Sequence, residues 1–131
     1  MLVDKQIEER GESLIFPFEE THVNSVSYDL DIEGRVNMEG KIEKNSFCLH
    51  PNETVLIKTV QNLDMPNDLV GIIGERNSRI RQGLQVSGPR YFPGHKTSIY
   101  LRVTNLSPFD IDIQPNTGIA QIFFEESNLS N

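Results

Sequence analysis

The chain of 131 residues has one cysteine, no surplus of positive charge and no long apolar run. The lone Cys48 excludes an internal disulfide and a cysteine cluster for a metal. A net charge of −7 leaves no basic surface for the nucleic-acid backbone, although a local pocket can still bind a free nucleotide. No segment is long and apolar enough to span a membrane, and no secretory leader is evident. We therefore expect a cytoplasmic protein without a nucleic-acid or membrane partner.

Common enzyme motifs are also missing. There is no Gly-x-Ser-x-Gly nucleophile elbow and no Walker loop. There is no His-x-Glu paired with Cys-x-x-Cys, which excludes the zinc deaminase mechanism. Cys48 and His50 share one face of an expected strand, but two residues do not make a metal site, so we interpret them as a strand-end pair.

The length fits one domain with a modest core, and short strand-like segments are separated by turns. Turns recurring about every eight to twelve residues predict an all-β sandwich or barrel. Helix is expected only near the N-terminus and over 77–82. We expect one domain over 1–124 and a short polar tail over 125–131. The expected strands are 13–16, 26–32, 47–49, 54–60, 69–73, 84–86, 98–104, 109–113 and 119–124.

The strand expected over 26–32 has the clearest alternation, with one apolar and one polar face. Its polar face carries Ser27, Asp29 and Asp31. The two aspartates could hold a hard cation through water. Polar sheet faces are common, however, and we interpret this one as a solvated face.

The segment 71–84 is the one place built to hold an anion. Its apolar strand ends in a tight turn, after which Asn77 or Ser78 can cap a short helix that Gly83 ends. A helix N-terminus and arginine forks favour a phosphate-sized ligand. These residues alone leave open a solvated helix face whose arginines pair with nearby carboxylates. The arginines on or beside the turn are Arg76, Arg79 and Arg81.

Taken together, the segments resemble the superfamily of dCTP deaminases and trimeric dUTPases, in the family's order. The resemblance implies an all-β subunit of the dUTPase-like β-clip or distorted-barrel type, with one short helix after the arginine turn. It also implies a homotrimer with pockets between subunits for a pyrimidine deoxynucleoside triphosphate (dCTP, dUTP or dTTP), and Mg²⁺ carried on the triphosphate. The matching segments are 25–30, 49–59, 65–71, 75–84, 90–94 and 115–121.

The resemblance assigns roles to particular residues. Asp29 would contact Mg²⁺ through the triphosphate. The positions implied to bind the nucleotide or its phosphates are Arg76, Asn77, Ser78, Arg81, Arg90 and Gln121.

The departures from the family pattern fall at the chemically important positions. Arg102 stands where deaminases have a proton-transferring glutamate, and an arginine cannot act as that base. Phe92 stands where dUTPases have the aspartate that positions water. Asn77 replaces a serine of the phosphate motif, and Gly118 replaces a cation before the final Ile-Ala-Gln. No glycine-rich lid follows Phe124.

Three hypotheses follow. We favour a binding protein with lost or reduced catalysis, because loss of a general base typically costs about 10²–10⁴ in rate. The second is an active dCTP deaminase or dUTP diphosphatase that uses another carboxylate. The third is a structural trimer without a small ligand. The carboxylates available to the second are Asp29, Glu75 and Glu19.

Overall fold

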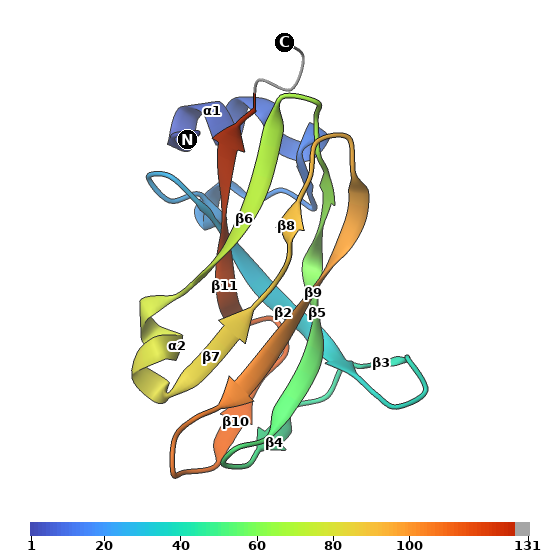
Figure 1. Cartoon of the computed structure of the whole chain (residues 1–131), viewed down its shortest axis with the longest axis vertical. Helices are drawn as coiled ribbons and strands as arrows, with labels where there is room; N and C mark the ends of the chain where they lie inside the picture. The colour runs from blue at the N-terminus through green and yellow to red at the C-terminus, as the bar shows by residue number, and fades with distance from the viewer. Residues whose placement is uncertain (128–131) are drawn as a thin grey trace.

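A computed structural model of the chain describes residues 1–127 and confirms the all-β class (Figure 1). One large antiparallel sheet runs in the order β7-β9-β5-β2-β11-β6-β8, with β1 added to β5 and β3 added to β2. A separate two-stranded sheet pairs β10 with β4 at the end of the molecule opposite the N-terminal helix (Figure 1). The strands are β1 (Ile15–Phe16), β2 (Tyr28–Val36), β3 (Ile42–Glu43), β4 (Phe47–Leu49), β5 (Thr54–Asp64), β6 (Leu69–Glu75), β7 (Leu84–Ser87), β8 (Arg90–Tyr91), β9 (Lys96–Asn105), β10 (Ile111–Ile113) and β11 (Gly118–Glu126).

Each expected strand has a counterpart, and the differences lie at the ends. β5 continues to Asp64, and β11 continues to Glu126, which pairs with Leu69 of β6. The expected polar tail therefore begins later than residue 125, and 128–131 lie outside the described residues. Two further strands of two residues each, β3 and β8, lie outside the expected set, and Pro89 and Pro93 enclose β8.

The core follows the alternation of the sequence. Every second residue is buried from Tyr28 to Gly34 in β2 and from Ile99 to Asn105 in β9, as expected for strands with one face on a core. Burial of each large aliphatic side chain contributes about 1.5–3 kcal/mol. The buried residues of these two strands include Tyr28, Leu30, Ile32, Ile99, Leu101 and Val103.

The N-terminal segment is fastened to the sheet by helix α1 (Asp4–Arg10). Ile7 is fully buried, and the Leu2 backbone N–H donates to the carbonyl of Phe124 at 2.8 Å. The Arg10 guanidinium donates to both carboxylate oxygens of Asp68 at 3.1 and 2.8 Å, which lowers the pKa of Asp68. Two 3₁₀ turns follow, η1 (Gly11–Ser13) and η2 (Glu20–His22). No helix among the described residues has the length and apolar character needed to cross a membrane.

Candidate functional site

Strands β2, β11 and β6 place residues that are far apart in the sequence side by side in the sheet. Gln121 of β11 lies opposite Asp29 of β2 on one side and Gly74 of β6 on the other. The Gln121 amide nitrogen donates to the backbone carbonyl of Glu75 at 3.0 Å, and its oxygen accepts from the Ser27 hydroxyl at 2.7 Å. Gln121 therefore joins the start of β2 to the end of β6, and both ends of its amide are used inside the chain.

The arginine turn leads from β6 into helix α2 (Asn77–Gln82). Arg76 is the N-cap in an extended conformation, and its carbonyl accepts from the Arg79 N–H at 3.0 Å. The expectation that Asn77 or Ser78 caps the helix is wrong, because the helical turn begins one residue earlier. Gly83 ends the helix with a left-handed φ of +96°, as expected.

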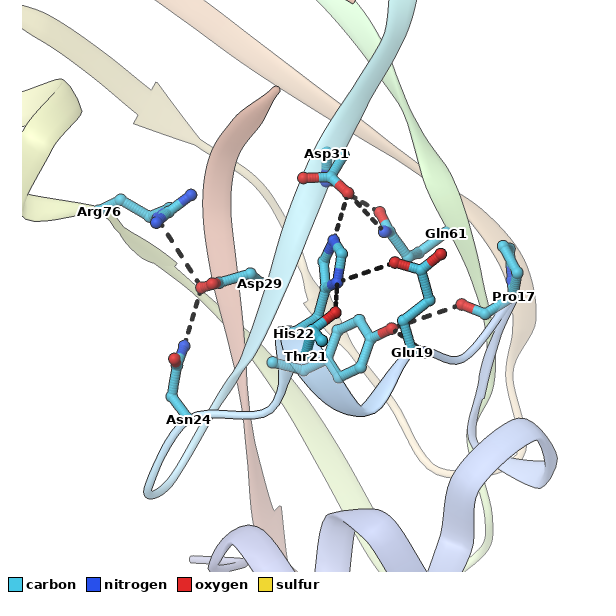
Figure 2. Close-up of polar contacts among 10 residues, drawn as sticks. Pro17, Glu19, Thr21, His22, Asn24, Asp29, Asp31, Gln61 and Arg76 are labelled. Carbon is cyan, nitrogen blue, oxygen red and sulfur yellow. Dashed lines mark hydrogen bonds and ion pairs between the residues drawn. The ribbon is translucent and has the colours of Figure 1, made fainter. Parts of the chain in front are cut away.

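Arg76 lies between β2 and the beginning of β11. Its Nε is 3.7 Å from an Asp29 carboxylate oxygen, and that oxygen also accepts from the Asn24 amide at 2.8 Å (Figure 2). A Cβ atom added to Gly118 would lie 1.7 Å from Nη1 of Arg76. Because Gly118 has no side chain, it leaves the space that the Arg76 guanidinium fills. The positive charge above Gly118 is therefore supplied by Arg76.

Arg79 points into the protein. Its guanidinium donates to the Gly118 carbonyl at 2.9 Å, the Thr117 hydroxyl at 3.1 Å and the Gln82 side-chain oxygen at 3.0 Å. Burial lowers its pKa, and so does the neighbouring positive charge of Arg76. Arg79 ties α2 to the turn before β11, so it is part of the framework.

The remaining predicted phosphate residues face solvent. Asn77, Ser78 and Arg81 are exposed on α2, and Arg90 is exposed on β8. The three arginines of the turn thus have different surroundings. Arg79 bonds inward to the turn before β11, Arg76 pairs with the Asp29 carboxylate, and Arg81 is exposed.

Arg102 lies on the outer face of β9, opposite Leu56 of β5 and Ser87 of β7. It borders a cavity of about 290 Å³, and no carboxylate is among the lining residues. Phe92, which the resemblance sets at the place of the dUTPase aspartate, is 64% exposed after β8. The cavity is lined by Leu56, Ser87, Gly88, Pro89, Tyr100 and Arg102.

The carboxylates suggested as substitute catalytic groups are held elsewhere. A Glu75 carboxylate oxygen accepts from the Val86 backbone N–H at 2.6 Å, which links β6 to the edge strand β7. A Glu19 oxygen lies 3.1 Å from Nδ1 of His22. Asp29 pairs with Arg76 as described above. None of the three borders the cavity beside Arg102.

Asp29 and Asp31 do not form the solvated face expected from the sequence. Their side chains are only 19% and 20% exposed. Asp31 contacts Nε2 of His22 at 2.5 Å and accepts from the Gln61 amide at 3.4 Å (Figure 2). The two aspartates thus have different partners. A cation beside Asp29 would also be repelled by the positive charge of Arg76. The pair does not fit a direct Mg²⁺ site.

We expect Glu75→Ala to lower the free energy of unfolding by about 1.5–3 kcal/mol, the value of a hydrogen bond to a charged group. The reason is that the Val86 N–H at the sheet edge loses its acceptor. Glu75→Gln keeps an oxygen there and should lose about 1 kcal/mol or less. Urea unfolding measures both changes. Wild-type stability in Glu75→Ala would show that this carboxylate is free for another role.

Comparisons with known proteins agree with this architecture. The family model described as dCTP deaminase-like matches residues 36–127. The chain is 33% identical over 114 residues to a dCTP deaminase of Wigglesworthia glossinidia brevipalpis, covering 86% of this chain and 56% of that protein. It is 30% identical over 128 residues to a dCTP deaminase of Thermococcus kodakarensis, covering 95% and 81%. The chain thus spans about half the length of some of the deaminases that it matches.

Solved structures show the same fold. The crystal structure of a dCTP deaminase from Agrobacterium tumefaciens superposes with a TM-score of 0.77 at 14% identity, covering 94% of this chain and 47% of that one. A mutant dUTPase from phage phi11 of S. aureus, described with a structural Mg(II) ion, superposes with a TM-score of 0.65 at 15% identity, covering 83% and 82%. The family match over residues 36–127 and the deaminase relatives place this chain in the dCTP deaminase-like family.

Proposed function

We propose that this chain forms a homotrimer that binds a pyrimidine deoxynucleoside triphosphate between subunits, with deaminase and diphosphatase catalysis lost or strongly reduced. The observation that carries this proposal is the cavity beside Arg102. By the resemblance, Arg102 stands where deaminases have the proton-transferring glutamate, and no carboxylate lines the cavity that Arg102 borders. Because arginine stays protonated at working pH, it can bind an anion but cannot accept a proton from water.

The exposed cations support binding of the triphosphate. Arg81 and Ser78 lie on the solvent side of α2, and Arg90 is exposed on β8. Arginine forks match phosphate oxygens, and a hydroxyl adds a further donor. Arg76 is held in place by Asp29 and is 35% exposed, so part of its guanidinium remains available. Gln121 then acts as a positioning residue that fixes the end of β6 from which the turn begins.

The exposed apolar side chains beside the cavity support the trimer. Leu56 and Tyr100 are each 42% exposed and line the cavity. Contiguous exposed apolar side chains often mark contacts with another chain. A second subunit placed against this face would cover them and complete a pocket that a single chain leaves open.

In this proposal Mg²⁺ binds as part of the Mg²⁺–triphosphate complex. Asp29 is engaged by Arg76 and Asn24, so this chain offers the ion no direct carboxylate ligand there. When bound, Mg²⁺ would neutralise phosphate charge. The protein's own contribution is then the arginines and hydroxyls that orient the phosphates.

The alternative is an active dCTP deaminase or dUTP diphosphatase, which the 33% identity to a deaminase favours. It requires a carboxylate to reach the cavity beside Arg102 from another element or subunit. The third candidate, a structural trimer without a small ligand, requires that nucleotides leave the protein's stability unchanged.

The experiment that separates these functions combines product analysis with calorimetry. Purified protein is incubated with Mg²⁺ and dCTP, dUTP or dTTP, and the nucleotides are resolved by anion-exchange chromatography. We expect unchanged nucleotides together with saturable binding in titration calorimetry. Formation of dUTP, or of a monophosphate and pyrophosphate, would establish an active enzyme. Absence of binding heat and of thermal stabilisation with all three nucleotides would favour the structural trimer.

A further inference from the structure

A mixed cluster of side chains lies at the end of the molecule formed by β4 and β10. Cys48, His50 and Asp110 each offer one potential metal-ligand atom, and these atoms all lie within 4.8 Å of one another. Nδ1 of His50 is 3.7 Å from the Cys48 sulfur and 2.9 Å from a carboxylate oxygen of Asp110. The sequence brings only two of these residues together. The third joins them because Leu49 pairs with Ile111 across the two strands.

A buried amide holds the two ligand-bearing segments at a fixed separation. Asn105 is fully buried, and its side-chain nitrogen donates to the carbonyl of Leu49 at 2.9 Å and to that of Phe109 at 2.7 Å. Leu49 directly precedes His50, and Phe109 directly precedes Asp110. The backbones that carry two of the three ligands are therefore positioned by one residue, without help from a cation.

The distances suit a small tetrahedral ion. With Zn–S of about 2.3 Å and Zn–N and Zn–O of about 2.0–2.2 Å, ligand atoms in a tetrahedral site lie about 3.3–3.6 Å apart. The sulfur–nitrogen distance of 3.7 Å is close to this value. The nitrogen–oxygen distance of 2.9 Å is that of a hydrogen bond. It would lengthen by about 0.5 Å when the ion replaces the proton between these two atoms.

The surroundings are negative. Asp112 is the cross-strand partner of Cys48. A Glu53 carboxylate oxygen accepts from the His50 backbone N–H at 2.6 Å, which fixes the turn after β4. Neither carboxylate belongs to the three-residue cluster, but both add to the attraction for a cation.

We propose that Cys48, His50 and Asp110 bind a divalent cation of borderline softness, Zn²⁺, with water as the fourth ligand. Thiolate and imidazole favour Zn²⁺ over the hard cations Mg²⁺ and Ca²⁺, and three protein ligands with one open position are a common zinc arrangement. The ion would fasten β4 to β10 from the outside, on the far side of the strands from the buried Asn105. This site is independent of the nucleotide pocket proposed above.

The test uses Co²⁺ as a spectroscopic substitute on the full-length, tag-free protein, kept reduced by a phosphine. We expect one Co²⁺ per chain, a thiolate-to-cobalt charge-transfer band, and full displacement by one equivalent of Zn²⁺. Cys48→Ser should abolish the charge-transfer band. His50→Ala and Asp110→Asn should weaken Co²⁺ binding by at least about tenfold, the lower end of what loss of even an outer-shell partner costs.

The matched control is Asp112→Asn, which removes the same charge two residues further along the chain, within β10, while leaving the ligand set intact. It should keep the one-to-one stoichiometry and the charge-transfer band, and circular dichroism confirms that each variant is folded. The proposal is overturned if the wild-type protein shows no sulfur-to-cobalt band. It is equally overturned if Asp112→Asn weakens binding as much as Asp110→Asn, because binding would then reflect only a diffuse acidic surface.

Discussion

Replacing Arg81 with alanine is expected to weaken binding of a pyrimidine deoxynucleoside triphosphate about ten- to a hundredfold, while stability stays unchanged. Arg81 is exposed on α2, and within residues 1–127 it makes no hydrogen bond or ion pair to another side chain. Its positive charge is therefore available to a phosphate. A charge-assisted hydrogen bond is worth about 1.5–3 kcal/mol, which corresponds to the stated loss of affinity. Titration calorimetry with dCTP, dUTP and dTTP in the presence of Mg²⁺ measures the change.

Arg35→Ala is the matched control for this variant. Arg35 is also a surface arginine, but it lies near the end of β2, where it pairs with Glu43 at 3.3 Å and covers the Phe47 ring at 4.8 Å. Both variants change the net charge equally. If Arg35→Ala weakens binding as much as Arg81→Ala, the effect is general electrostatics. If neither variant changes binding, the arginine turn does not hold the phosphates.

The strands and the arginine helix could be predicted because their information is local. Alternating residues in β9 place Ile99, Leu101 and Val103 on the buried face, and the sequence shows that pattern directly. The helix after the turn ends at a glycine in the left-handed conformation, a position that the sequence marks. The N-cap is Arg76, one residue before Asn77 and two before Ser78, and it makes no side-chain cap hydrogen bond, so backbone geometry rather than side-chain chemistry sets the start of this short helix.

The partners of charged residues could not be predicted from the sequence. Arg79 and Arg81 are two residues apart on one helix, yet Arg79 bonds to the carbonyl of Gly118, 39 residues away. Asp31 likewise contacts Gln61, 30 residues away, and so is not solvated. These contacts depend on which strands become neighbours across the sheet. Local periodicity indicates which face a residue occupies but not what lies above that face.

Arg102 has one feature that local alternation predicts and one that depends on which strands are neighbours. Alternation places Arg102 on the outer face of β9, and the structure confirms it. That the neighbouring cavity contains no carboxylate becomes visible only when β5, β7 and β9 are assembled. The resemblance predicts a departure from the family pattern at Arg102, whereas the groups that the guanidinium can contact depend on the surroundings that the fold provides.

Asn105→Ala is expected to lower the free energy of unfolding by about 2–4 kcal/mol, because buried polar groups left without partners cost about 1–3 kcal/mol each. Four hydrogen bonds of its side chain are lost. Two are donated to the carbonyls of Leu49 and Phe109, and two are accepted from the N–H and the hydroxyl of Ser107 at 2.9 and 2.7 Å. The sequence predicts that Asn105 is an ordinary loop residue, but in the structure it is fully buried. Urea unfolding, with a linear extrapolation to water, measures the loss.

Asn45→Ala is the matched control, because Asn45 is exposed in the loop before β4, and its replacement should change stability by less than about 0.5 kcal/mol. Asn105→Asp distinguishes the hydrogen bonds that the side-chain oxygen accepts from those that the side-chain nitrogen donates. It retains an oxygen for Ser107 but presents a carboxylate oxygen to the Leu49 and Phe109 carbonyls, so it should be at least as destabilising as Asn105→Ala. A loss below about 1 kcal/mol for both variants would contradict this account, because it would mean that other partners replace the amide: water at the Leu49 carbonyl, and water or the Ser107 hydroxyl, 3.0 Å away, at the Phe109 carbonyl. The separation of β4 and β10 would then depend on the antiparallel pairing of the two strands, from Leu49 with Ile111 to Phe47 with Ile113.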